Sequence, residues 1–268
     1  MTGIEYRKVL TVSKPFKSLT KSIKKTGGRG QGGRITVRHR GGGAKRRYRL
    51  IDFIQNNLDV KARVETIEYD PSRTAFIARI VYPTGRRAYI LSPQELKVGD
   101  SVVSSQKQLP INPANRLPLK DIPVGAFVHN IELNPGEGGK LARSAGTSCE
   151  VIAKDGGFVH LALPSSEIRK ISETARASIG VLSNPENRMV VVGKAGRSRW
   201  LGIRPTVRGS AMNPVDHPLG GGEGRAPRGL KRPKNLWGKG IRGVKTRRKK
   251  KPSNIFIIQR RKKKLRKK

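Results

Sequence analysis

The chain has 268 residues, a formal net charge of +40, 35% hydrophobic residues and one cysteine, Cys149. A single cysteine excludes a disulfide framework and a cysteine-based zinc finger, and no aliphatic run is long enough to cross a membrane. The opening residues lack the apolar core of a signal peptide, so we expect a soluble protein of a reducing compartment.

Positive charge is concentrated at the two ends of the chain. Residues 1–50 hold 15 Lys/Arg against one acid, and residues 197–268 hold 25 against two. Residues 51–196 are nearly balanced, with 18 Lys/Arg against 15 acids. Because such ends repel themselves unless an anion neutralises them, this distribution makes nucleic acid the leading partner.

Residues 1–33 end in a Gly/Arg-rich run that is too polar to pack a core, so we predict a basic N-terminal arm. From Arg34 onward, short apolar runs alternate with turn residues at roughly ten-residue spacing, which is typical of a small antiparallel barrel. The predicted strands of this block are 34–40, 48–53, 64–69, 75–81 and 87–91.

A proline-rich connection then leads to a second β block. Residues 147–153 and 158–163 flank Asp155-Gly156-Gly157, which indicates a hairpin. Further strands are predicted at 166–171 and 189–192. The tail that follows has many glycines and prolines and few aliphatic residues, so we expect it to be ordered mainly by what it binds. The sequence therefore predicts an all-β protein with two small tandem barrels.

Signatures of enzymes are absent from the sequence. There is no phosphate-cradling loop, no Gly-x-Ser-x-Gly elbow and no His-Glu-x-x-His motif, and the four histidines lack metal-ligand spacing. The group Asp216, His217 and Glu223 is the one candidate for acid/base chemistry. An Asp–His pair in a Gly/Pro-rich loop is more often a turn or an RNA contact, so we predict that the chain is not an enzyme.

Clusters of arginine and glycine are the stronger signal. Glycine lets the backbone approach a phosphate, and arginine supplies planar, bidentate donors. One cluster follows the first glycines and comprises Arg29, Arg34, Arg38 and Arg40, with Arg46 and Arg47 after Gly41–Gly43. A second comprises Arg197, Arg199, Trp200, Arg204 and Arg208, in which the indole could stack on a base. The alternative is that these arginines are ordinary solvated surface charges. The scarcity of acidic residues that could pair with them argues against this alternative.

Several long segments resemble one family. The stretch Val207–Pro218, continuing into Gly220–Arg225, resembles the hallmark segment of large-subunit ribosomal protein two, the universal L-two family, in its bacterial or organellar form. Gly33–Gly43, Glu68–Pro71 and Gly138–Thr147 resemble further family segments in the same order. The similarity covers nearly the whole chain after about residue 26.

The resemblance implies an OB-type barrel followed by an SH3-like barrel, with basic N- and C-terminal arms. The expected domains are a basic N-terminal arm, 1–33; the OB-type barrel, 34–118; the SH3-like barrel, 119–196; and a basic C-terminal region, 197–268. It also implies rRNA contacts by Arg34, His39, Arg40, Arg143, Arg199, Trp200, Arg204, Arg208, Asn213, His217 and Arg225. His217 is expected to be a contact or organising residue and not a catalyst.

The implied role is a structural constituent of the large ribosomal subunit. It would bind large-subunit rRNA near the peptidyl-transferase region and the subunit interface, and support assembly, subunit association and tRNA placement. Expected partners are that rRNA, neighbouring ribosomal proteins, nearby tRNA and, through an intersubunit bridge, small-subunit rRNA, with no membrane. No cofactor is expected beyond magnesium associated with rRNA. The expected location is the cytoplasmic ribosome of a bacterium, with a plastid or mitochondrial ribosome as the alternative.

Three departures from the family pattern stand out. The family commonly has a second histidine where this chain has Leu219, the usual family opening is not recognisable in Met1–Lys25, and residues 225–248 align only loosely. Two rival classes remain open. A general nucleic-acid compaction protein should bind duplex DNA as well as rRNA. An RNA-acting enzyme would need turnover that depends on Asp216, His217 and Glu223.

Overall fold

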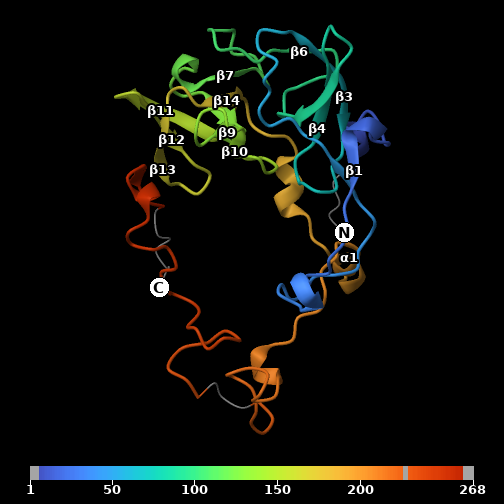
Figure 1. Cartoon of the computed structure of the whole chain (residues 1–268), viewed down its shortest axis with the longest axis vertical. Coiled ribbons are helices and arrows are strands. Elements are labelled where there is room, and N and C mark those ends of the chain that lie inside the picture. Colours follow the sequence, from blue (N-terminus) through green and yellow to red (C-terminus); the bar gives the residue numbers. More distant parts are fainter. Residues whose placement is uncertain (1–5, 226–228, 262–268) are drawn as a thin grey trace. The chain divides into compact units, whose positions relative to one another are not determined.

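The computed structural model describes residues 6–225 and 229–261. These residues form strands, turns and short 3-10 helices, with one α-helix in the described part, α1 (Ala195–Trp200). Figure 1 shows these elements along the chain, and the contacts within the chain divide it into two compact units. The barrel unit comprises residues 6–24, 45–191 and 253–261, and the arm unit comprises residues 25–44 and 192–252.

The first barrel of the barrel unit is built on a four-stranded antiparallel sheet in the order β5-β4-β3-β6. Its strands are β3 (Ala62–Glu68), β4 (Ile77–Val81), β5 (Arg87–Leu91) and β6 (Ser101–Val102). At the start of β3, Ala62 and Val64 are buried while Arg63 is exposed, because successive side chains of a strand point to opposite faces. Their buried side chains form a core of their own with Ile80 and Ile90.

The second barrel is built on a seven-stranded antiparallel sheet in the order β15-β13-β12-β11-β8-β14-β7. Its strands are β7 (Arg116–Pro118), β8 (Phe127–His129), β11 (Cys149–Asp155), β12 (Phe158–Ala162), β13 (Ile168–Ser172), β14 (Arg176–Ile179) and β15 (Ile257–Gln259). A separate core that includes Leu117, Val128 and Leu161 fills it. Asp155 pairs with Phe158, so the predicted hairpin is confirmed, and Gly156 and Gly157 between them have φ of +55° and +78°, as a two-residue type I′ turn requires.

Smaller elements complete the chain. Two-stranded ladders join β1 (Thr20–Ser22) to β2 (Arg47–Arg49) and β9 (Ile131–Glu132) to β10 (Gly139–Leu141). The 3-10 helices are η1 (Tyr6–Lys8), η2 (Lys17–Leu19), η3 (Gln31–Gly33), η4 (Leu119–Asp121), η5 (Pro185–Met189), η6 (Gly209–Ala211) and η7 (Pro252–Asn254). The sheets form half-barrels consistent with an OB-type and then an SH3-like barrel, so the predicted all-β class is confirmed.

Two of the predicted strands are wrong, and the strand predicted at 48–53 is found only in part, as β2 (Arg47–Arg49). Residues 34–40 are turns with single bridges from Ile35 to Arg29 and from Arg40 to Ile203, and His39 has a φ of +60° that no strand residue adopts. Residues 189–192 begin at the end of η5 and continue as irregular chain. Neither of these two apolar runs forms a ladder with a neighbouring strand.

The expected domain boundaries stay predictions. Residues 6–24 of the expected N-terminal arm belong to the barrel unit, where Thr11 donates its amide to the Ile67 carbonyl oxygen at 3.1 Å. Residues 25–33 group with the arm unit, and residues 253–261 of the expected C-terminal region group with the barrel unit. Residues 1–5, 226–228 and 262–268 of the two expected arms lie outside the described residues.

Candidate nucleic-acid interface

Most of the predicted RNA-contacting residues lie together in the arm unit. Its two segments carry five and 18 Lys/Arg, against Asp216 and Glu223 as the only acids in their sequence. The predicted contacts found there are Arg29, Arg34, His39, Arg40, Arg197, Arg199, Trp200, Arg204, Arg208, Asn213, His217 and Arg225. Arg46, Arg47 and Arg143 belong to the barrel unit.

Backbone hydrogen bonds join the two segments of the arm unit. The Gly41 amide donates to the Gly202 carbonyl oxygen at 3.0 Å, and the Ala44 amide donates to the Trp200 carbonyl oxygen at 2.9 Å. Gly43 has a φ of +80°, and a Cβ there would lie 2.8 Å from Gly202 Cα. The glycine turn is therefore required for this close approach, which brings residues distant in sequence to one place.

A basic hollow of about 540 Å³ opens at this junction. Its charged lining is Arg29, Arg38, Arg40 and Arg204, and no carboxylate lines it. None of the salt bridges in the described part of the chain involves these four arginines. Unneutralised guanidinium groups around an open hollow favour a phosphate-bearing ligand.

His39 lines the same hollow in a fixed orientation. Its Nδ1 lies 3.0 Å from the Pro205 carbonyl oxygen, which can only accept, so Nδ1 carries the proton. In the neutral ring, Nε2 is then an acceptor. This arrangement suits a ligand hydroxyl, such as a ribose 2′-OH, that can donate a hydrogen bond.

Trp200 ends the short helix α1 and is 59% exposed. The Lys194 ammonium lies 5.1 Å from the centre of its ring, a cation–π contact. Arg199 is half-buried, and its Nη1 donates to the Ile203 carbonyl oxygen at 3.4 Å, whereas Arg204 is exposed. The exposed indole provides a stacking surface for an unpaired base in a strongly basic segment.

His217 is held inside a closed loop of residues 209–221. Its Nδ1 accepts a hydrogen bond from the Leu219 amide at 3.0 Å, so the proton of the neutral ring lies on Nε2. The His217 amide donates to the Asn213 carbonyl oxygen at 3.2 Å, while the Arg208 and Asn213 side chains are exposed. Within the described residues, the His217 ring is hydrogen-bonded to the Leu219 amide and not to the Asp216 or Glu223 carboxylate.

Arg143 marks a second basic hollow, of about 620 Å³, within the barrel unit. Its guanidinium carbon lies 4.2 Å from the centre of the Phe53 ring, and its Nη1 donates to the Gly139 carbonyl oxygen at 2.9 Å. Arg73 and Lys140 line the same hollow. The sequence did not predict Arg73 and Lys140 as contacts, and it predicted Arg38 only as a member of the first arginine cluster.

The other two predicted contacts of the barrel unit differ in surroundings. Arg46 is half-buried and its Nη1 donates to the Pro71 carbonyl oxygen at 3.1 Å. Arg47 is exposed at the start of β2.

Other classes of site find no support in the described residues. No group of three or more His, Cys, Asp or Glu side chains among residues 6–225 and 229–261 could hold a metal ion. Within the same residues, no helix has the length and apolarity needed to cross a membrane.

Fold and site together define an all-β, basic RNA-binding protein. Residues 16–104 match the family model described as Ribosomal Proteins L2, RNA binding N-terminal domain, and residues 112–238 match Ribosomal Proteins L2, C-terminal domain. The chain belongs to this family of ribosomal proteins. Family membership makes it a structural protein of the large ribosomal subunit with an RNA-binding N-terminal domain.

Proposed function

We propose that the chain binds large-subunit rRNA near the peptidyl-transferase region and the subunit interface, and that it supports assembly, subunit association and tRNA placement. The observation that carries this proposal is the basic hollow of the arm unit, where Arg29, Arg38, Arg40 and Arg204 converge without a carboxylate. The two barrels fold around their own cores, and the strongly basic arm unit supplies most of the proposed RNA contacts.

The proposed mechanism is electrostatic docking followed by local recognition. Each phosphate that a guanidinium neutralises releases condensed counterions, so binding of the isolated chain weakens as salt rises. Specificity comes from RNA shape, unpaired bases and 2′-hydroxyls. Trp200 supplies the stacking surface, and His39 and His217 supply an acceptor and a donor of defined position.

The proposed partners are large-subunit rRNA, neighbouring ribosomal proteins, nearby tRNA and small-subunit rRNA across a bridge. We propose no cofactor on the protein itself, with magnesium bound only to the rRNA around it. A bacterial ribosome is the proposed location. The role is architectural and involves no turnover by the protein.

Sucrose-gradient sedimentation of native lysate in high-salt buffer tests the proposal. The expected result is retention of the chain in the large-subunit peak. Release to the top of the gradient, together with equal affinity for duplex DNA and rRNA in purified form, would instead identify a general compaction protein.

A double variant tests the arm unit directly. Trp200→Ala with Arg204→Ala removes the stacking surface and one cation of the hollow, so incorporation into large subunits should fall while the barrels stay folded. Arg86→Ala is the matched control, because it removes the same charge from an exposed turn between β4 and β5. Normal incorporation of the double variant would contradict the assignment of the arm unit as an rRNA-binding region.

A further inference from the structure

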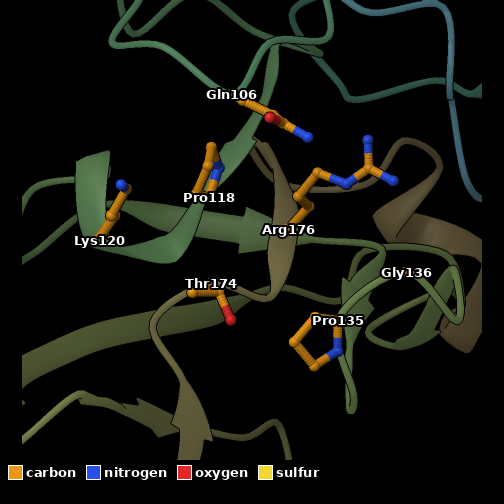
Figure 2. Close-up of a pocket in the computed structure, with 7 residues that line it drawn as sticks. All are labelled: Gln106, Pro118, Lys120, Pro135, Gly136, Thr174 and Arg176. Carbon is orange, nitrogen blue, oxygen red and sulfur yellow. The ribbon is translucent and has the colours of Figure 1, made fainter.

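A third pocket, of about 380 Å³, lies in the barrel unit, and none of its lining residues was a predicted RNA contact. Figure 2 shows the side chains that surround it. They are Gln106, Pro118, Lys120, Pro135, Gly136, Thr174 and Arg176. They come from the loop after β6, the end of β7, η4, the turn after β9 and the start of β14.

The buried carboxylate of Glu132 fixes the backbone of two segments that line this pocket. Glu132 Oε2 accepts hydrogen bonds from the Gly136 amide and the Arg176 amide, both at 3.1 Å. Glu132 Oε1 accepts from Arg116 Nη2 at 3.0 Å, and both of these side chains are fully buried. Because one group fixes both the turn at Gly136 and the start of β14, the pocket is a built feature of the fold.

Arg176 presents a positioned cation to the pocket. Its side chain is only 9% exposed, and its Nη2 donates to Asn56 Oδ1 at 3.0 Å. Its Nε lies 3.7 Å from Glu132 Oε1, and its Nη1 has no hydrogen-bond partner among the described residues. One amino group of a fixed guanidinium is thus available to a ligand.

Two arginines lie next to this part of the pocket. Arg116 and Arg176 both pair with the Glu132 carboxylate, Asp52 adds a weaker attraction for Arg116, and Arg116 Nε is buried without a hydrogen-bond partner. Burial lowers the pKa of Arg116 to about 10, although Glu132 opposes the shift. No carboxylate lines the pocket itself, so its electrostatics favour an anionic ligand.

The remaining residues that line the pocket suit the binding of a nucleobase. The rings of Pro118 and Pro135 are apolar surfaces, whereas the exposed Gln106 amide can both donate and accept hydrogen bonds. Figure 2 shows Gln106 and Arg176 with their polar ends toward the same side. Lys120, also exposed, adds a second cation. The base of a nucleotide has apolar faces and a polar edge, and the phosphate of the nucleotide needs a cation.

We propose that this pocket takes one unpaired nucleotide of large-subunit rRNA. The base lies against the proline rings with its edge toward Gln106 and Arg176, and the phosphate lies toward Lys120. This inference rests on the proposed function and adds a contact in the SH3-like barrel region to those of the arm unit. A pocket of this volume accommodates a single nucleotide and excludes a helix.

Filter binding of the purified full chain to large-subunit rRNA tests the pocket. Gln106→Ala with Lys120→Ala should weaken binding about tenfold, because the variant loses the hydrogen bonds to the base edge and the cation for the phosphate. Both side chains are exposed, so the variant should fold. The matched control is Gln94→Ala with Lys97→Ala, which removes the same two residue types from exposed positions of the same unit.

The outcomes separate this inference from the proposed function. If the chain binds rRNA and the Gln106/Lys120 variant binds as tightly as the control, the pocket inference fails alone. If the parent chain does not bind rRNA, both fail. If AMP or GMP in equilibrium dialysis fills the pocket and the variant abolishes that binding without affecting rRNA, the ligand is a free nucleotide and the inference is overturned.

A photo-cross-linking residue in place of Gln106 gives a second readout. In assembled large subunits, irradiation should produce a cross-link to one unpaired rRNA nucleotide, mapped by primer extension. A cross-link to another protein, or none to RNA, would contradict the inference.

Discussion

At the residue scale, His129 shows how burial assigns a role that residue type leaves open. Its side chain is 1% exposed at the end of β8, and its Nδ1 donates to the Gly180 carbonyl oxygen at 2.9 Å. Burial lowers the pKa of His129 to about 4. The residue is therefore a neutral core histidine and not an RNA contact.

The His129 environment predicts a loss of stability in acid. Between pH 6.5 and 4 the unfolded chain takes up a proton that the folded chain refuses, so the free energy of unfolding falls as pH falls. From pH 7 to 5 the loss from this group should be about 2 kcal/mol. Urea unfolding at the two pH values should show a larger drop for the parent chain than for His129→Gln. Equal drops would contradict the assignment.

Gly209 is a residue whose missing side chain makes room for His217. A Cβ at Gly209 would lie 2.4 Å from the His217 ring, so Gly209→Ala should displace the ring and break its hydrogen bond from the Leu219 amide. The NMR signals of the His217 imidazole nitrogens should shift. Gly196→Ala in α1 is the control, because nothing lies within 4 Å of the added carbon. Unchanged imidazole signals in Gly209→Ala would disprove the contact.

At the scale of elements, β15 closes one edge of the seven-stranded sheet. It pairs with β13, the Lys170 amide donates to the Phe256 carbonyl oxygen at 2.7 Å, and the Phe256 and Phe158 rings lie 6.3 Å apart. An edge strand exposes unpaired backbone groups, so this segment protects β13. It also returns the chain to the barrel unit after the arm unit.

Truncation tests the role of β15. Removing residues 253–268 should speed hydrogen exchange of the Lys170 amide about fivefold, which corresponds to one backbone hydrogen bond of about 1 kcal/mol. Removing residues 260–268 is the control, because it takes away basic residues and leaves β15 in place. The prediction fails if both truncations leave Lys170 equally protected.

At the scale of the whole molecule, the chain segregates its charge between two kinds of structure. The near-neutral middle of the sequence forms two barrels with separate cores. The arm unit combines segments from both basic ends, residues 25–44 and 192–252. Charge that would oppose folding of a core is thereby gathered where an RNA polyanion can neutralise it.

This segregation predicts which residues set the salt dependence of rRNA binding. Arg29→Ala, Arg40→Ala and Arg204→Ala combined should reduce the slope of log affinity against log salt by about two to three, since each phosphate contact contributes about 0.7–0.9. Arg63→Ala, Arg86→Ala and Lys97→Ala combined are the control in exposed positions of the barrel unit. Affinities for rRNA measured over a series of KCl concentrations decide the matter. Equal changes of slope in the two triple variants would refute the assignment.

Sequence patterns predicted the elements whose partners are close along the chain. The strand at 87–91 and the hairpin around Gly156-Gly157 are found as predicted, because local turn chemistry determines them. The alternating run 34–40 is not a strand, since its pairing depends on Ile203, far away in sequence. The sequence pattern also did not predict β15, which is stabilised by pairing with β13.

By itself, the sequence determined the all-β class, the segregation of charge and the residue types suited to RNA. Only the tertiary structure decided which of them meet: Arg38 joins Arg40 and Arg204, Arg73 and Lys140 join Arg143, and Glu132 organises the pocket at Arg176. The physical reason is the distance along the sequence over which each kind of interaction acts. Turns and alternation are local preferences of the backbone, whereas the binding hollow of the arm unit forms by hydrogen bonds between segments more than a hundred residues apart.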